Sequence, residues 1–169
     1  LRLPFLGYVP NIKTNSVVES GLQAHLHPQS NAAESFRTVR AAIALGAKAE
    51  KMRVFTVTST IPSEGKSLVA SNLAVVVAQT GLRTVLVDAD LRRPSLHKAF
   101  QLHSPMGLAA YLTEQTNRVD DGIQTTEVTN LDVACCGQIP SQPSELLGSQ
   151  RMVQFMQELS KRYDRVILD

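Results

Sequence analysis

The sequence predicts an α/β fold in which a parallel β-sheet is flanked by helices on both faces. Short runs rich in Val, Ile and Leu alternate along the chain with longer segments whose apolar residues follow a helical period. The tripeptide Gly65-Lys66-Ser67 lies between one such run and one such segment, and two further runs end in aspartate. Strands that alternate with helices are joined by right-handed crossovers, so the strands are expected to lie parallel.

The N-terminal part is expected to contain an arm followed by a helix. Residues 1–29 are rich in Pro, Asn and Ser and are expected to form the arm, whereas residues 30–169 are expected to form one domain with a sizeable core. Asn31 and Glu34 have the spacing of a capping box, so a helix is expected to begin near Asn31. Its apolar face is expected to consist of Phe36, Val39, Ile43 and Ala47.

The remaining elements follow in order along the chain. The apolar run Arg53–Thr58 indicates a buried strand, and Lys66–Thr80 indicates a helix that ends at the glycine cap Gly81. Thr84–Asp88 indicates a second strand. The pattern then predicts a short helix at Ser95–Phe100, a helical turn at Gly107–Leu112, a strand at Leu131–Cys135, a helix capped by Ser149 and a last strand at 165–169.

Composition narrows the classes of protein. The net charge of +2 is too small to indicate a nucleic-acid partner. No apolar run is long enough to span a bilayer, no signal peptide is present, and Leu1 as first residue suggests a fragment of a longer protein. The two cysteines, Cys135 and Cys136, are adjacent, which disfavours a disulfide between them and a metal site, so a reduced, cytoplasmic environment is expected.

A candidate phosphate-binding loop precedes the second helix. A loop between a strand and a helix N-terminus can bind phosphate oxygens through backbone N–H groups, and the helix dipole favours their charge. Lys66 can reach the β- and γ-phosphates, and the Ser67 hydroxyl can ligate Mg²⁺. Thr60 stands where the common motif has its first glycine. The expected nucleotide-binding residues are Thr60, Pro62, Ser63, Glu64, Gly65, Lys66, Ser67 and Leu68.

Three aspartates are expected at the carboxyl ends of strands, where open α/β sheets bind ligands. Asp88 and Asp90 follow one apolar run, and Asp169 follows another. Such a residue is costly unless it faces a cation or hydrogen-bond donors, and Asp169 fits a Walker B element that holds the water shell of Mg²⁺. The alternatives are that Asp88 and Asp90 only cap the 91–94 turn and that Asp169 is an ordinary strand-end residue.

Several of these segments together resemble the bacterial tyrosine kinases (BY-kinases), the cytoplasmic kinase domains of polysaccharide co-polymerases. These kinases belong to the P-loop (MinD/ParA-like) ATPase superfamily, which implies a P-loop NTPase fold of the SIMIBI/MinD type. The matching segments are residues 58–67 (Walker A), 85–94 (Walker A′), 137–147 (the Pro-x-x-Pro-Ser-Glu-Leu-Leu segment), 34–40 (the Glu-x-x-Arg-x-x-Arg motif) and 3–10 (the juxtamembrane stretch).

The resemblance implies an ATP- and Mg²⁺-dependent autokinase that transfers the γ-phosphoryl group to tyrosines in a neighbouring subunit's C-terminal tail. It implies Lys66, Asp88 and Asp90 as catalytic residues, and Ser67, Asp88 and Asp169 as metal-binding residues. One Walker A′ aspartate would hold the metal's water shell and the other would accept the tyrosine proton. The resemblance favours Asp88 as this base, although the sequence does not rank the two.

The resemblance also implies partners and a location. The protein would regulate polymerisation and export of exo- or capsular polysaccharide at the cytoplasmic face of the bacterial inner membrane. It would form a ring-like homo-oligomer through Glu34, Arg37 and Arg40 and work with a membrane-spanning co-polymerase region or an activator protein, not with nucleic acid. The alternative for these three residues is a surface ion pair on a solvated helix.

Two departures keep other functions open. Tyr8, Tyr111 and Tyr163 are scattered and form no C-terminal cluster, and the chain stops at the Walker B aspartate. A nucleotide-gated assembly scaffold without kinase output is therefore one alternative. A MinD/ParA-type partitioning ATPase is the other, but such proteins usually carry a lysine early in the phosphate loop, where this chain has Ser59 and Thr60.

Overall fold

A five-stranded sheet organises the computed structural model, which describes residues 4–46, 52–103 and 105–169. Within these residues the strand order is β1-β5-β2-β4-β3. The strands are β1 (Val54–Thr56), β2 (Thr84–Val87), β3 (Ile123–Thr125), β4 (Leu131–Ala134) and β5 (Arg165–Leu168). The pairs β1–β5, β5–β2 and β2–β4 are parallel, as the sequence predicts, whereas the edge strand β3 is antiparallel to β4. The sequence analysis did not predict β3.

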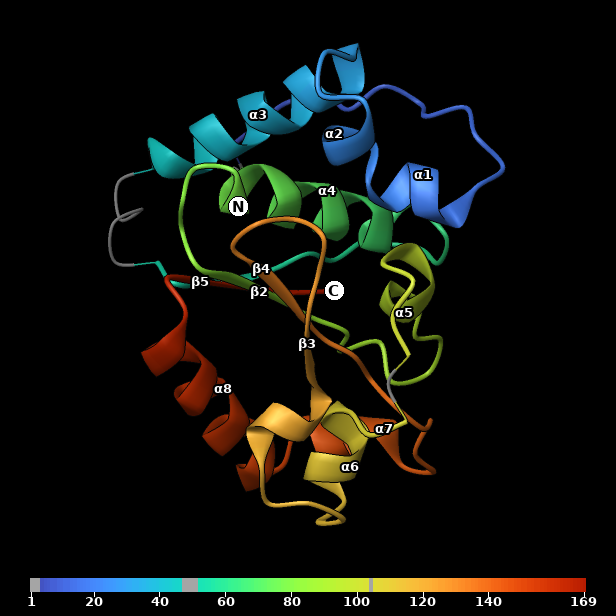
Figure 1. The fold of residues 1–169 in the computed structure, drawn as a ribbon, viewed down its shortest axis with the longest axis vertical. Coiled ribbons are helices and arrows are strands. Elements are labelled where there is room, and N and C mark those ends of the chain that lie inside the picture. Colours follow the sequence, from blue (N-terminus) through green and yellow to red (C-terminus); the bar gives the residue numbers. More distant parts are fainter. Residues whose placement is uncertain (1–3, 47–51, 104) are drawn as a thin grey trace.

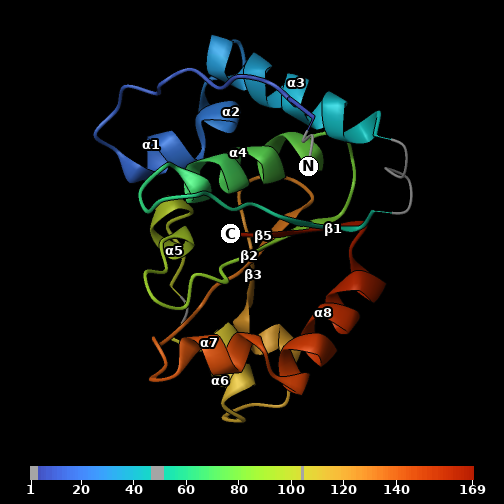
Figure 2. The same ribbon diagram turned by 180° about the vertical axis from the view of Figure 1, so that it is seen from behind.

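Helices cover both faces of the sheet, as expected (Figure 1). On one face α4 (Lys66–Ala78) packs on the strands, and α1 (Val17–Gly21), α2 (Gln23–Leu26) and α3 (Asn31–Ala44) pack on α4. On the other face lie α6 (Leu108–Leu112), α7 (Pro143–Leu147) and α8 (Gln150–Arg162), with the 3₁₀ turn η1 (Val119–Gly122) beside α6. The short helix α5 (Leu96–Ala99) packs against α1. Figure 2 shows the same two layers from behind.

Alternation along the strands builds a separate core on each face of the sheet. Leu86 and Ile167 point to the α4 side, where they join a fully buried set that includes Val75. Val85 and Val166 point to the other side and pack with residues of α6 and α8. Because both faces are covered, the central strands β2 and β5 are almost continuously apolar.

Two local expectations are wrong. The run Arg53–Thr58 was expected to be a buried strand, but β1 is the edge strand of the described sheet and Val54 is 42% exposed. The cap of α3 is Ser30, whose Oγ accepts a hydrogen bond from the Ala33 N–H at 3.2 Å. The predicted capping box of Asn31 with Glu34 therefore does not form. The expected apolar face of α3 is present in Phe36, Val39 and Ile43.

Some expectations lie outside the described residues. Ala47 of the predicted apolar face and Leu3 of the juxtamembrane match are among them. The structure describes the rest of the predicted arm, and it contains α1 and α2, neither of which was predicted. Along the described part of the chain, no helix is long and apolar enough to cross a membrane.

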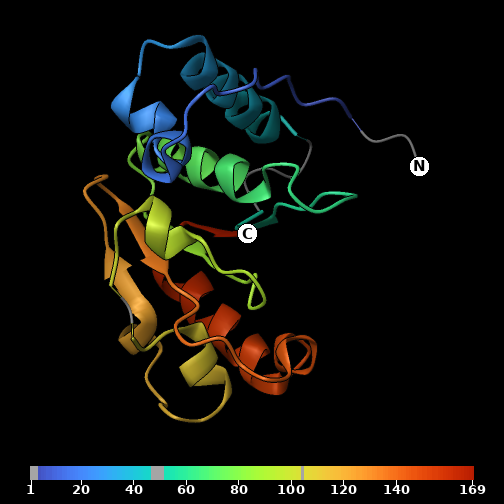
Figure 3. The same cartoon turned by 90° about the vertical axis from the view of Figure 1, so that its right-hand side faces the viewer.

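The predicted arm is fastened to the helices beneath it. Its first described residues run along α3, where Gly7 lies against Val39 (Figure 3). Asn72 of α4 is fully buried; its Oδ1 accepts from the Ala24 N–H at 2.8 Å, and its Nδ2 donates to the Ser20 carbonyl at 2.8 Å. Residues 17–26 are thus bound to α4 by a buried amide whose hydrogen bonds are satisfied.

The contact between α1 and α5 is tight enough to test. A Cβ placed on Gly21 would lie 2.7 Å from the Cβ of Ala99. Alanine is intrinsically better than glycine in a helix by about 1 kcal/mol, but such an overlap costs roughly 1–3 kcal/mol. We therefore expect Gly21→Ala to lower the free energy of unfolding, measured by urea denaturation.

The matched control is the double variant. Ala99→Gly removes the atom that the new methyl group would strike, so Gly21→Ala combined with Ala99→Gly should be more stable than the sum of the two single changes predicts. A Gly21→Ala protein that is more stable than the parent would contradict this tight packing.

Candidate functional site

Three segments meet at the carboxyl edge of the sheet. Thr56 of β1 and Val87 of β2 both pair with Leu168 of β5, so the residues that follow these strands emerge side by side. The Asp169 N–H donates to the Val87 carbonyl at 3.0 Å. This register brings Asp88, Asp169 and the start of the 58–65 loop together, at the edge where the sequence analysis expected a ligand site.

The 58–65 loop has the backbone of an anion-binding turn. Ser63 has a φ of 65° and Gly65 a φ of 86°, both in the left-handed region. Gly65 is the N-cap of α4, and Lys66 and Ser67 are the first two helical residues. Left-handed residues beside helical ones aim successive N–H groups at one point, and the helix start adds unpaired donors. Only glycine adopts the Gly65 conformation without strain.

A cleft opens beside this loop. Lys66, Asp90, Arg92 and Arg93 line it together with residues 58–62. Three cationic side chains thus border the cleft, in an otherwise nearly neutral chain. An anionic ligand is the chemistry that this lining favours.

Asp88 is the most deeply buried carboxylate of the site, with no exposed surface. Its Oδ2 accepts from the N–H groups of Ser95 and Leu96, both at 3.1 Å, and so anchors the start of α5. Its Oδ1 has no hydrogen-bond partner among the described residues. Burial raises the pKa of Asp88 to about 7; the Leu96 N–H opposes this rise, and the nearby Asp169 carboxylate adds to it.

Asp169 lies on the neighbouring strand and is 7% exposed. Neither of its carboxylate oxygens has a well-formed hydrogen bond within the described part of the chain. Burial raises its pKa, while the nearby Ser67 hydroxyl and Lys66 ammonium act in the opposite direction. Asp169 is therefore close to the first two residues of α4, as a Walker B aspartate would be.

Asp90 shapes the turn that carries the two arginines. Its Oδ1 accepts from the N–H groups of Arg92 at 3.2 Å and Arg93 at 2.9 Å. The Arg92 guanidinium in turn donates to the Ser144 hydroxyl of α7 at 2.9 Å. Asp90 thus caps the 91–94 turn, as the capping alternative expects, whereas Asp88 binds N–H groups that lie just beyond this turn.

The residues of the site fit a magnesium–nucleotide complex. Three buried carboxylate oxygens, on Asp88 and Asp169, have no well-formed hydrogen bond among the described residues. A buried carboxylate without partners is favoured by a nearby cation or its water shell. The hard oxygen donors of Asp88, Asp169 and Ser67 are the ligand type that Mg²⁺ or its waters prefer. The loop and Lys66 offer N–H groups and positive charge for phosphates.

The Glu64 carboxylate turns back onto its own loop. Its Oε2 accepts from the N–H groups of Thr60 at 3.1 Å and Ile61 at 3.2 Å. The Thr60 hydroxyl donates to the same oxygen at 3.3 Å. The sequence motif predicts Glu64 as a nucleotide-binding residue but gives no sign of this contact.

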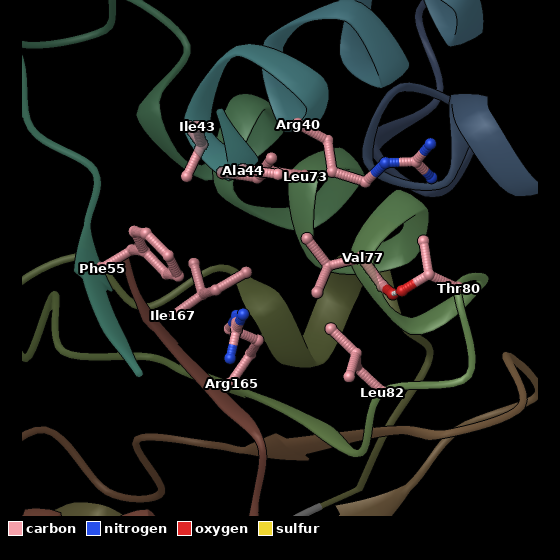
Figure 4. A pocket seen from close by; sticks show the side chains of 10 residues that line it. All are labelled: Arg40, Ile43, Ala44, Phe55, Leu73, Val77, Thr80, Leu82, Arg165 and Ile167. Carbon is pink, nitrogen blue, oxygen red and sulfur yellow. Dashed lines mark hydrogen bonds between the residues drawn. The ribbon is translucent and has the colours of Figure 1, made fainter. Parts of the chain in front are cut away.

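The expected oligomerisation residues lie on α3, away from the site, and contact their own chain. Arg37 pairs with Glu34 at 2.8 Å and also donates to the Pro28 carbonyl. Arg40 donates to the Val76 carbonyl of α4 at 2.8 Å. Figure 4 shows Arg40 at the rim of an apolar pocket between α3, α4 and the β1–β5 edge.

Two further residues of the site region escaped sequence analysis. The Ser144 hydroxyl accepts a hydrogen bond from Arg92. Both residues lie in segments that match the family, but the sequence gives no sign that they contact each other. Asn72 joins α4 to the arm. An amide within the mostly apolar run 68–78 could have been used as a sign of a buried polar contact.

Known proteins resemble this chain over most of its length. The family model for ParA, described as an NUBPL iron-transfer P-loop NTPase, matches residues 51–162. Tyrosine-protein kinase YwqD of Bacillus subtilis (strain 168) is 38% identical over 154 residues, which cover 91% of this chain and 65% of that protein. The chain thus spans slightly less than two thirds of that relative.

Two solved structures are similar over nearly the whole chain. The crystal structure of the chimerical protein CapA2B2 superposes with a TM-score of 0.89 at 36% identity, covering 99% of this chain and 70% of that one. The BceF tyrosine kinase domain superposes with a TM-score of 0.83 at 35% identity, covering 99% of this chain and 71% of that one.

The raised pKa of Asp88 predicts a pH-dependent stability. Its carboxyl has an ordinary pKa near 4 when the chain is unfolded and a pKa of about 7 when folded. Between these values the folded state holds the proton more tightly, so stability falls as the pH rises from about 4 to about 7. Asp88→Asn keeps an acceptor for α5 without this titration. Its free energy of unfolding relative to the parent should therefore rise by on the order of 2–4 kcal/mol across this range.

The measurement is denaturant unfolding of the nucleotide-free protein at several pH values. Asp120→Asn is the control, because Asp120 pairs with Arg162 at the surface and exposed pairs contribute little. A stability difference between Asp88→Asn and the parent that does not change with pH would contradict the raised pKa.

Proposed function

We propose that this chain, which belongs to the family of bacterial tyrosine-protein kinases with a P-loop NTPase fold, binds Mg·ATP and transfers its γ-phosphoryl group to tyrosine hydroxyls. The observation that carries the proposal is that Asp88, Asp169 and the start of α4 meet at one edge of the sheet, where one oxygen of Asp88 and both of Asp169 lack a hydrogen-bond partner in the described part of the chain. Phosphoryl transfer needs charge neutralisation and positioning more than covalent chemistry, and this site offers both.

Each residue then has a distinct task. Backbone N–H groups at the start of α4 bind phosphate oxygens, and Lys66 neutralises charge on the γ-phosphate. Ser67 and Asp169 would hold Mg²⁺, which when bound would supply neutralisation of phosphate charge. We assign Asp88 the role of proton acceptor, because its buried Oδ1 has no hydrogen-bond partner among the described residues and is available to accept a proton. Asp90 supports it by holding the turn.

The wider role is proposed from the resemblance. The phosphate acceptors would be tyrosines in a neighbouring subunit's C-terminal tail, and the output would be control of exo- or capsular polysaccharide polymerisation and export. The protein would act at the cytoplasmic face of the bacterial inner membrane, with a membrane-spanning co-polymerase region or an activator protein. Residues 4–10, which resemble the juxtamembrane stretch, support this placement.

The catalytic assignment is tested by changing charge without changing shape. Asp88→Asn and Asp90→Asn should each reduce phosphate transfer from ATP to a tyrosine-containing copolymer by orders of magnitude, because Asn neither accepts the proton nor carries the charge. The same preparations are assayed for ATP hydrolysis, which reports turnover where the copolymer is a poor acceptor.

Lysine variants separate binding from chemistry in this test. Lys66→Met should abolish Mg·ATP binding measured by calorimetry, because its ammonium neutralises phosphate charge, while leaving the fold intact. Lys161→Met is the control, since Lys161 pairs with Glu158 at the surface of α8. Near-full activity of both Asp88→Asn and Asp90→Asn would show that these aspartates do not have the proposed catalytic roles.

We also propose that α3 contributes one face of a head-to-tail ring. A heterologous interface uses two different patches and closes when its rotation permits. Glu34 is the most available member of the motif, with a side chain that is 70% exposed, compared with 29% for Arg37. Because Arg37 and Arg40 also bind carbonyl groups of their own chain, their contribution combines holding α3 in place with presenting charge.

Charge reversal at Glu34 is therefore the cleaner test of this interface. Glu34→Arg should weaken self-association, measured by light scattering on concentrated protein, and high salt should weaken it in the parent by screening exposed pairs. Glu127→Arg, at an exposed site between β3 and β4, is the control. Arg37→Glu combined with Arg40→Glu should also weaken assembly. Unchanged assembly in all α3 variants would mean that the motif is a solvated helix face.

A further inference from the structure

We propose that Glu64 is a positioning residue whose carboxylate binds backbone N–H groups of the phosphate loop and so holds the loop in one shape. The Thr60 hydroxyl adds a further hydrogen bond to the same carboxylate, and we call this set of contacts the staple. The inference rests on the nucleotide-binding part of the proposed function and gives one residue of that site a different task. Glu64 would not contact the nucleotide through its side chain; its carboxylate would fix the shape of the loop that does.

Three donors converge on one oxygen of Glu64. The N–H groups of Thr60 and Ile61 and the hydroxyl of Thr60 all donate to Oε2, at 3.1, 3.2 and 3.3 Å. Bonds to an ionised acceptor are stronger than those between neutral groups. The contact closes a ring from residue 60 to residue 64 and joins the two limbs of the loop. Ser59 adds a second closure, because its hydroxyl donates to the Ile61 carbonyl at 2.8 Å.

The staple accounts for the one departure of the loop from the common motif. Thr60 stands where glycine is usual, and a glycine there would supply the N–H group but not the hydroxyl. The branched side chain of Thr60 also restricts the backbone, which lowers the entropy lost when the loop becomes ordered. The residue that departs from the motif is therefore one of the two that hold the loop.

Because the N–H groups of residues 60 and 61 bind Glu64, the loop has two parts with different roles, which we call its early and late limbs. The early limb, residues 60 and 61, has its donors satisfied by Glu64. The late limb, with Ser63 and Gly65 in left-handed conformations, leads into the unpaired N–H groups at the start of α4. Phosphates would be bound by the late limb alone. A loop that already has its binding shape loses less conformational entropy when the ligand binds.

The first experiment measures affinity for Mg·ADP by calorimetry on the full chain. Glu64→Ala should weaken binding by roughly three- to ten-fold, because it removes all three hydrogen bonds to the carboxylate and each bond is weak at this exposed site. Glu64→Gln keeps an acceptor oxygen and should stay within about two-fold of the parent, because an amide carbonyl also accepts N–H donors. Thr60→Ala should give a smaller loss than Glu64→Ala. Glu127→Ala, remote from the loop, is the control.

A second measurement detects the hydrogen bonds of the staple in the absence of nucleotide. Amide hydrogen exchange at residues 60 and 61 should be faster in Glu64→Ala than in the parent, and Glu64→Gln should restore most of the protection. If the parent does not bind Mg·ADP, the proposed function fails while exchange still decides whether the staple exists. Unchanged exchange in Glu64→Ala would overturn the proposal. Tighter Mg·ADP binding by Glu64→Ala would also overturn it, since the carboxylate would then compete with the phosphates.

Discussion

The buried carboxylate of Asp88 is the constraint on which the site depends. One of its oxygens binds the first N–H groups of α5 and so fixes how the chain leaves β2, while the other has no partner among the described residues. A residue that only capped α5 would work equally well as Asn, with no charge to bury. A carboxylate in this position, beside the buried carboxylate of Asp169, is unfavourable in the nucleotide-free protein. The site is therefore stabilised by whatever cation it receives.

The arm and the site are parts of one packed unit. Asn72 binds the arm to α4, and Gly21 of the arm packs against Ala99 of α5. The helix α4 begins at the phosphate loop, and α5 begins at the N–H groups that Asp88 holds. The arm thus touches the two helices whose N-termini form the site. Division of the chain into residues 1–29 and 30–169 is accordingly a division of sequence composition, whereas packing continues across it.

The sequence predicted what is encoded locally. The phosphate loop, the strand before Asp88 and the cap Ser149 were found because short patterns of glycine, charge and apolar residues specify them. The strand at 54–56 looked buried because its residues are apolar, but its edge position depends on strand order, which no local pattern contains. The three-residue β3 exists through pairing with β4. The cap of α3 was missed because Ser30 and Asn31 are both good caps, and only the backbone decides between them.

Side-chain contacts at the site could not be predicted from the sequence. The residue types around the cleft followed from motifs, but which oxygen of Asp90 caps the turn, and which donors Glu64 binds, depend on how the loops fold. The same holds for Arg37 and Arg40, whose guanidinium groups bind the carbonyls of Pro28 and Val76. A charge that looks available in a sequence can already be used within the chain. The charges with most freedom to act on a ligand are therefore those left unpaired after internal contacts are assigned, and at this site they include the unpartnered oxygens of Asp88 and Asp169.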